Sequence, residues 1–213
     1  MIRLTRRALL AAASLPSVAA AVGWSRPSQG EPSGPLDQPL RQLYAALEAA
    51  MRTGHTVPFA QRFDALAPLV DQVFDLETVL KVSVGLRWDS MEPDVRARLL
   101  KTYRRVTVAT YVANFDRFDG ERFQILPGRR DAGADRILPA EIVGGGGHLR
   151  LDYVMRDGDG TWRAVDVLLE GSIRQVAVQR SHFRNVLASG DPNALIASLR
   201  RKVADLSGGA LNS

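Results

Sequence analysis

The chain of 213 residues contains no cysteine. This absence excludes disulfide bonds, thiolate chemistry and attachment of a lipid to an N-terminal cysteine. There are only three histidines, His55, His148 and His182, and none has a second histidine or a cysteine at the four-residue spacing that places two zinc ligands on one helix face. The sequence therefore favours neither a redox protein nor a zinc enzyme.

Motifs for covalent catalysis and phosphate binding are also missing. No Gly-x-Ser-x-Gly segment presents a nucleophilic serine. The glycine run 144–147 precedes a strand-like segment and lacks a following Lys-Ser or Lys-Thr, which favours a hairpin loop over a phosphate-binding loop. Asp157 and Asp159 have calcium-loop spacing, but Trp162 stands where that motif needs glycine. We expect a turn there, and no catalytic residue, metal or cofactor.

Asp166 is an acidic residue in the middle of an apolar strand-like segment, between Val165 and Val167, which gives it two interpretations. It could be a catalytic acid in a pocket, or a carboxylate that pairs with an arginine and helps to hold the sheet. Burying an unpaired carboxylate is costly, so we favour the ion pair. Arg163, Arg174 and Arg180 are the candidate partners, and the sequence does not choose among them.

Outside the N-terminus the sequence has no apolar run of the about 20 residues that a membrane-spanning helix needs. At the N-terminus, Arg6 and Arg7 precede an apolar run at 8–18, and alanines follow at 19–21. That layout is typical of a cleaved export signal at residues 1–21, for the general secretory or the twin-arginine route. An uncleaved anchor is the alternative.

The formal net charge of +5 overstates the basic character of the rest of the chain. Without the three arginines of the export signal, 25 basic and 23 acidic residues remain, so nucleic acid is not indicated as a partner. Proline, glycine and serine in residues 22–35 predict a flexible linker. We expect a single folded domain at 36–206 and a tail at 207–213.

The apolar spacing predicts helices first, then strands, then helices. Helices are expected at 36–53, 57–67, 68–74, 76–84, 91–118, 173–187 and 192–206, and strands at 123–125, 137–143, 149–155 and 162–169. This order indicates an α+β fold with a curved antiparallel sheet of about four strands packed on a long helix, plus a helical subdomain. The apolar stripe of helix 91–118 is wider than contact with one flat surface needs, which suggests a sheet and a cavity beside it.

Several apolar residues exceed what a minimal core needs, and we expect them to line a hydrophobic pocket. In the final strand we place Val165, Val167 and Leu169 on the pocket face, with Asp166 on the opposite face. The alternative is that these side chains simply pack against one another. The predicted pocket residues are Trp88, Tyr111, Phe115, Tyr153, Met155, Val165, Val167, Ile173 and Phe183.

The segment 161–202 resembles the MlaC family of exported lipid-binding proteins, also called the toluene-tolerance family. The matching features are the strand Trp162–Val167, the turn Glu170–Ile173, Arg180-Ser181-x-Phe183 and the end Ala194–Lys202. The amino-acid sequence of this turn and of the helix after it looks most like the hopanoid-associated, HpnM-like branch of the family.

The resemblance implies an NTF2-like sheet-and-helix unit joined to a helical subdomain, with lipid tails between them. It implies a periplasmic carrier that moves phospholipid or hopanoid between the inner and outer membranes without chemistry. The implied partners are the lipid, lipid transport complexes of both membranes and, transiently, a membrane surface. Two alternatives stay open: an NTF2-like enzyme for a hydrophobic substrate, with Asp166 or His182 as acid or base, and an anchored structural adaptor of an envelope complex.

Overall fold

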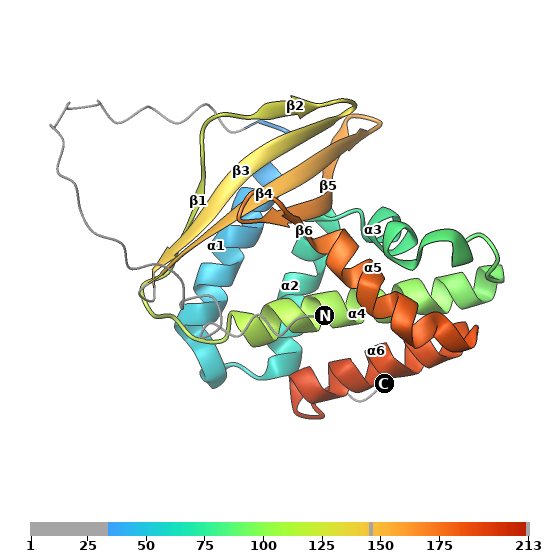
Figure 1. Cartoon of the computed structure of the whole chain (residues 1–213). Coiled ribbons are helices and arrows are strands. Elements are labelled where there is room, and N and C mark those ends of the chain that lie inside the picture. The colour runs from blue at the N-terminus through green and yellow to red at the C-terminus, as the bar shows by residue number, and fades with distance from the viewer. Residues whose placement is uncertain (1–33, 145–146, 212–213) are drawn as a thin grey trace, which may run out of the picture.

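A curved antiparallel sheet lies across a group of helices, with one face toward them (Figure 1). The computed structural model describes residues 34–144 and 147–211. The predicted export signal at 1–21, the linker as far as residue 33 and the last two residues of the predicted tail lie outside the described residues. Among the described residues, no helix is both long enough and apolar enough to cross a membrane.

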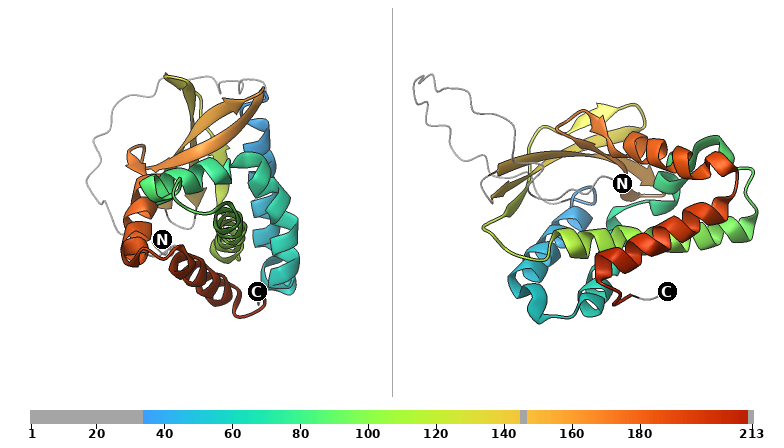
Figure 2. Two further views of the ribbon diagram at one scale, coloured as in Figure 1. Left: turned by 90° about the vertical axis from the view of Figure 1, so that its right-hand side faces the viewer. Right: turned by 60° about the horizontal axis from the view of Figure 1, so that its bottom comes forward.

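Within residues 34–144 and 147–211, four α-helices precede the sheet and two follow it, in the predicted order. They are α1 (Gln38–Thr53), α2 (Phe59–Val73), α3 (Leu76–Val84), α4 (Pro93–Asn114), α5 (Gln175–Val186) and α6 (Pro192–Ser207). Three short 3-10 turns, η1 (Gly54–Thr56), η2 (Gly85–Arg87) and η3 (Leu187–Ser189), follow α1, α3 and α5. Helix α6 packs against α4 on the side away from the sheet (Figure 2).

Local sequence explains where these helices begin and end. Buried Leu40, Leu43 and Leu47 recur on one face of α1, and the helix ends at Gly54, whose φ of 53° suits glycine. Asp75 caps α3, since its carboxylate accepts a hydrogen bond of 3.0 Å from the backbone N–H of Thr78.

The prediction that Pro68 starts a separate helix is wrong. Pro68 lies inside α2, which continues to Val73. Proline removes one backbone hydrogen bond, to the carbonyl group four residues earlier. Pro68 is on the exposed side of the helix, where water can satisfy that carbonyl group, while Leu66, Val70 and Val73 stay buried. Burial of the apolar face outweighs the local cost of proline.

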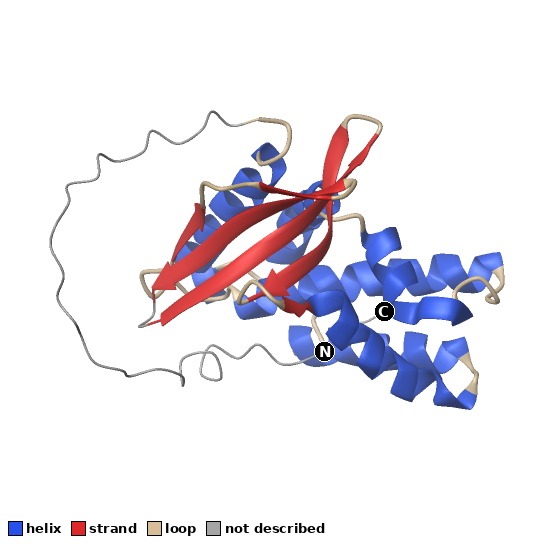
Figure 3. Ribbon diagram, turned by 45° about the horizontal axis from the view of Figure 1, so that its top comes forward, coloured by secondary structure: helices blue, strands red, loops and turns tan. Residues whose placement is uncertain are grey.

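The sheet confirms the predicted α+β class, with an open curved antiparallel sheet beside the helices (Figure 3). Its main strands are β1 (Arg122–Ile125), β3 (Asp135–Gly144), β4 (Gly147–Gly158) and β5 (Thr161–Leu169), paired in the order β1-β3-β4-β5. Two short strands, β2 (Arg130–Ala132) on β3 and β6 (Ile173–Arg174) on β5, raise the number in the described part of the chain from the predicted four or so to six.

A β-bulge in β5 changes which of its side chains face the helices. Val154 pairs with Asp166, but its neighbour Met155 pairs with Ala164, so Val165 is an extra residue on β5. The bulge shifts the alternation by one position. Ala164 packs in the main core beside the helices, whereas Val165 lies with Val154 in a separate small cluster. The predicted strict alternation, with Val165 and Val167 on one face, is therefore wrong at Val165.

Candidate functional site

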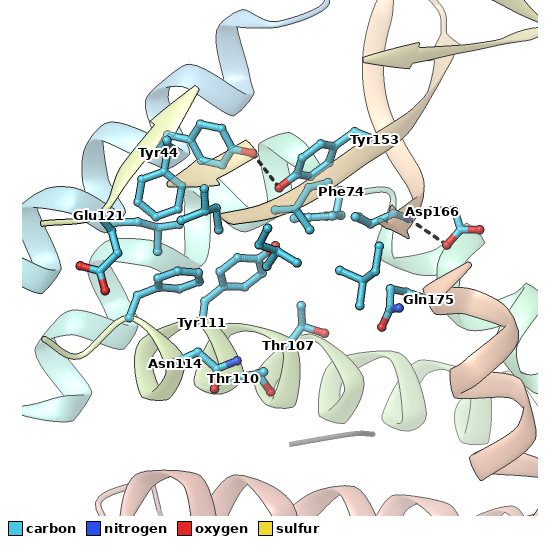
Figure 4. Close-up of a pocket in the computed structure, with 18 of the residues that line it drawn as sticks. Tyr44, Phe74, Thr107, Thr110, Tyr111, Asn114, Glu121, Tyr153, Asp166 and Gln175 are labelled. Atoms are coloured by element: carbon cyan, nitrogen blue, oxygen red, sulfur yellow. Dashed lines mark hydrogen bonds between the residues drawn. The ribbon is translucent and has the colours of Figure 1, made fainter. Parts of the chain in front are cut away.

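A cavity of about 490 Å³ lies between the helix-facing side of the sheet and α4 (Figure 4). Helices α1, α3 and α5 and the end of α2 complete its walls. The lining side chains come from the helices (Tyr44, Leu47, Leu76, Val79, Tyr103, Thr107, Thr110, Tyr111, Asn114, Gln175, Val176, Val178, Gln179), from the strands (Phe123, Ile142, His148, Leu149, Leu151, Tyr153, Asp166, Val167, Leu169) and from connecting segments, among them Phe74 directly after α2. A volume of this size is typical of a pocket for a small organic ligand.

Aromatic rings surround the middle of the cavity. The rings of Tyr111 and Phe115 stack with centroids 6.0 Å apart, and Phe74 lies 6.0 Å from Tyr111. From the helix side, the hydroxyl of Tyr44 donates a 3.1 Å hydrogen bond to the hydroxyl oxygen of Tyr153 on the sheet. This bond gives each phenol oxygen a partner within the wall.

The hydroxyl groups of the tyrosines in the cavity wall stay protonated at neutral pH. Burial raises the pKa of Tyr111 and that of Tyr153 well above the ordinary value of 10, and raises the pKa of Tyr103 to about 12. A phenol with such a pKa is not a nucleophilic phenolate at neutral pH. The aromatic wall therefore offers apolar surface and neutral hydroxyls.

Polar groups on the helical side are mostly engaged within the protein. The hydroxyls of Thr107 and Thr110 donate to carbonyl groups one turn earlier, at 3.0 and 2.7 Å. Gln179 lies between α3 and α4, where its side-chain oxygen accepts hydrogen bonds from Tyr103 at 2.9 Å and Ser83 at 2.8 Å. This buried cluster closes one end of the cavity between α3, α4 and α5.

Charged residues border the other end, where the β3–β4 hairpin meets the loop after α4. Arg117, Asp119 and His148 are exposed there, and Glu121 accepts a 2.6 Å hydrogen bond from the backbone N–H of Asp119. A Cβ atom at Gly144 would lie 2.6 Å from the Cα of Glu121, so only glycine permits this close approach. The cavity thus has an apolar middle, a polar closed end and a charged rim.

Four of the nine predicted pocket residues line the cavity. Tyr111 and Phe115 reach it from the end of α4, and Tyr153 and Val167 reach it from adjacent strands. Tyr153 and Val167 are direct cross-strand partners in the sheet, so they point to the same side.

The other five predicted pocket residues do not line it, which corrects their placement. Trp88, Met155 and Phe183 belong to the packed core, and the ring of Phe183 meets that of Tyr103 edge to face. Val165 is turned to the other face of the sheet by the bulge. Ile173 lies on β6 with 51% of its surface exposed.

Sequence reasoning missed many of the lining residues. Tyr44 and Leu47 lie on a helix face whose period marks them as buried, and the period does not tell a core contact from a cavity wall. Leu149 and Leu151 had a usable signal, because they alternate with polar residues in phase with Tyr153 on the same strand.

Asp166 forms the ion pair that the sequence favoured, and its partner is Arg174. The Nε atom of Arg174 lies 2.9 Å from Asp166 Oδ2, although not in hydrogen-bond alignment. Oδ1 accepts hydrogen bonds from the backbone N–H groups of Val167 at 2.8 Å and Val176 at 3.0 Å. Val176 is in the first turn of α5, so the carboxylate ties β5 to that helix start.

Those contacts occupy Asp166 within the fold, although it also borders the cavity. His182, the other residue of the enzyme hypothesis, is exposed on α5 and does not line the cavity. Among residues 34–144 and 147–211, no three His, Cys, Asp or Glu side chains gather as a metal site would require.

Comparisons with known proteins agree with this geometry. Residues 41–201 match the family model described as MlaC protein. A solved structure of a phospholipid-binding protein from Ralstonia solanacearum, in complex with a phospholipid, superposes with a TM-score of 0.65 at 16% sequence identity. The alignment covers 79% of this chain and 97% of that one. No curated protein sequence matches this chain.

Proposed function

Because the chain belongs to the MlaC family, we propose that it is a lipid carrier, which holds the hydrocarbon of one lipid in the cavity and moves it between the inner and outer membranes. The observation that supports this proposal most directly is the cavity beneath the sheet. Its middle is walled by aromatic and aliphatic side chains from both the strands and the helices.

The size of the cavity suits an acyl chain. If one methylene group takes up about as much room as one water molecule in the liquid, ~30 Å³, then 490 Å³ holds on the order of sixteen methylene groups. That is about one acyl chain of a membrane lipid. A second chain or a bulkier ring system would need the walls to move apart or part of the ligand to stay outside.

The energetic benefit of such a cavity is large. Moving one methylene group from a bilayer into water costs about 0.8 kcal/mol, so a sixteen-carbon chain costs on the order of 12 kcal/mol. A cavity that keeps the chain out of water removes most of this barrier. The charged rim would leave the headgroup in water, and the proposed function needs no nucleophile or metal.

The family and the predicted export signal support a periplasmic location. The ligand would be a phospholipid, as in the Ralstonia solanacearum structure, or a hopanoid, as the HpnM-like wording of the α5 segment suggests. Delivery would need transient contacts with lipid transport complexes in each membrane, or with the membranes themselves.

The direct test is to identify lipid that stays bound through gentle purification. Native mass spectrometry of the purified protein should show a mass increase equal to one lipid, and extraction should identify it. Denatured protein gives the unloaded mass as a control. A protein that carries no lipid, and that takes none up from vesicles containing phospholipid and hopanoid, would contradict the proposal.

A further inference from the structure

Two exposed apolar side chains lie near the end of α3. Val82 is 46% exposed and Leu86, in the η2 turn, is 92% exposed. Val82 lies in the last turn of α3, and Leu86 follows Gly85, where the helix ends with a φ of 72°. This end of the molecule lies far from β1 (Figure 1). Leu86 contributes almost nothing to the core, so the fold does not explain its apolar side chain.

Two arginines without a carboxylate partner lie beside Leu86. The guanidinium of Arg180, on α5, comes within 3.2 Å of the position that a Cβ atom would take at Gly85. Arg87 follows Leu86 directly and is exposed. Within the part of the chain that the structure describes, neither arginine forms an ion pair, whereas the nearby Lys81 pairs with Asp89 at 3.6 Å.

We propose that Val82, Leu86, Arg87 and Arg180, here called the α3–α5 patch, dock the protein on an anionic lipid bilayer. This inference rests on the proposed function, because a carrier must meet a membrane to exchange its lipid. The charges are complementary: guanidinium groups bind lipid phosphates through paired hydrogen bonds. An exposed leucine can insert among the acyl chains of a bilayer. An acidic protein would need a complementary apolar groove for this side chain, so we favour the bilayer as the partner.

The patch shares its two helices with the cavity. Helix α3 contributes Leu76 and Val79 to the cavity wall, and α5 contributes Val176 and Val178. Helices α3 and α5 pack against each other. A bilayer bound at the patch would therefore contact the same two helices that wall the cavity.

The expected binding is weak and reversible, as suits a carrier. Burying a leucine side chain fully in an apolar phase favours binding by at least about tenfold. Each arginine near an anionic surface strengthens binding by a further factor of about five. This electrostatic contribution falls as the salt concentration rises.

The experiment is co-sedimentation of the purified protein with vesicles. One set contains phosphatidylglycerol and phosphatidylcholine, and the other phosphatidylcholine alone. The wild-type protein should bind the anionic vesicles and lose most of that binding at high salt. Leu86→Ser should reduce binding about tenfold, and Arg87→Gln with Arg180→Gln should reduce it on the order of 25-fold.

Two control variants distinguish binding through the α3–α5 patch from non-specific hydrophobic binding and from an effect of net charge. Ile173→Ser removes another exposed apolar side chain, beside an arginine that already pairs with Asp166. Arg122→Gln with Arg163→Gln removes the same number of charges from exposed positions on the sheet. Both controls should bind anionic vesicles as the wild-type protein does.

Two results would overturn the inference: wild-type protein that does not bind anionic vesicles, or patch variants that bind no more weakly than the controls. A protein that binds acidic proteins but not anionic vesicles would give the first of these results, and it would therefore also overturn the inference. Native mass spectrometry of the same samples distinguishes failure of this docking proposal from failure of the proposed function. If the protein carries lipid but does not bind vesicles through the patch, it is still a lipid carrier, and its membrane contact lies elsewhere.

Discussion

Narrowing the cavity should shorten the lipid chain that the protein prefers, and Val167→Phe is the substitution that tests this. Val167 lies on β5 with its side chain at the cavity wall. Its neighbour Val165, two positions earlier on the same strand, belongs to a cluster on the other face of the sheet. The two valines therefore allow the same substitution inside and outside the cavity.

The size of the effect follows from the volume. Phenylalanine has four more side-chain carbons than valine, but ring carbons pack into less space than methylene groups, so they take the room of about two methylene groups, ~60 Å³, which is about an eighth of the 490 Å³ cavity. About two methylene groups of a filling chain are then displaced. At ~0.8 kcal/mol each, a long chain loses ~1.6 kcal/mol, which is on the order of 15-fold in affinity. A chain shorter by about two carbons should lose little.

The assay is a series of phospholipids with one headgroup and increasing acyl length, measured by displacement of a fluorescent lipid. The affinity of the wild-type protein should rise with chain length until the cavity is full. For Val167→Phe the rise should stop about two carbons earlier. Val165→Phe should follow the wild-type curve. Melting temperatures of all three proteins show whether the fold is kept, since overpacking a filled core is destabilising.

The reasoning would be refuted if Val167→Phe and the wild-type protein, both folded, showed the same dependence on chain length. The hydrocarbon would then lie somewhere other than this cavity. Equal shifts in Val165→Phe and Val167→Phe would show instead that the substitutions act through the whole sheet.

Three further predictions concern the walls of the cavity. Tyr44→Phe or Tyr153→Phe alone should lower the free energy of unfolding in urea by about 1–3 kcal/mol, because each leaves one buried hydroxyl without its partner, while the double variant should lose less than the sum of the two. Gly144→Ala should lower the melting temperature clearly and Gly158→Ala hardly at all, because only the former adds a Cβ 2.6 Å from facing backbone at a φ of 136°. Between pH 10 and about pH 12 the free energy of unfolding should fall, since Tyr103 ionises in the unfolded chain but keeps its proton in the fold until its raised pKa of about 12 is reached; stability that stays constant across that range would contradict this.

Sequence periodicity predicted much of the fold because it reports which face of an element is buried. The helices around Leu43, Leu80 and Leu99 and the four main strands have the predicted order, and the α+β class is confirmed. The predicted NTF2-like classification stays a prediction. The interruption expected at Pro68 is absent, since the burial of a whole helix face outweighs one lost backbone hydrogen bond.

The site was less predictable, for the same physical reason. Phe183 and Tyr111 both follow a helical apolar period, yet one packs on Tyr103 and the other faces an open space. Periodicity measures exclusion from bulk water, and a core contact and a cavity wall are equally excluded. Only the distance between the sheet and α4 decides between them, and that distance depends on every element packed around both.

By itself the sequence determined the order of the elements, the absence of cysteine chemistry and the need of Asp166 for a cationic partner. The tertiary structure decided that the partner is Arg174, that Val167 rather than Val165 meets the cavity, and that Leu86 lies in water. These choices depend on residues far apart in the chain or on a one-residue bulge, and neither changes the local apolar pattern that a sequence displays.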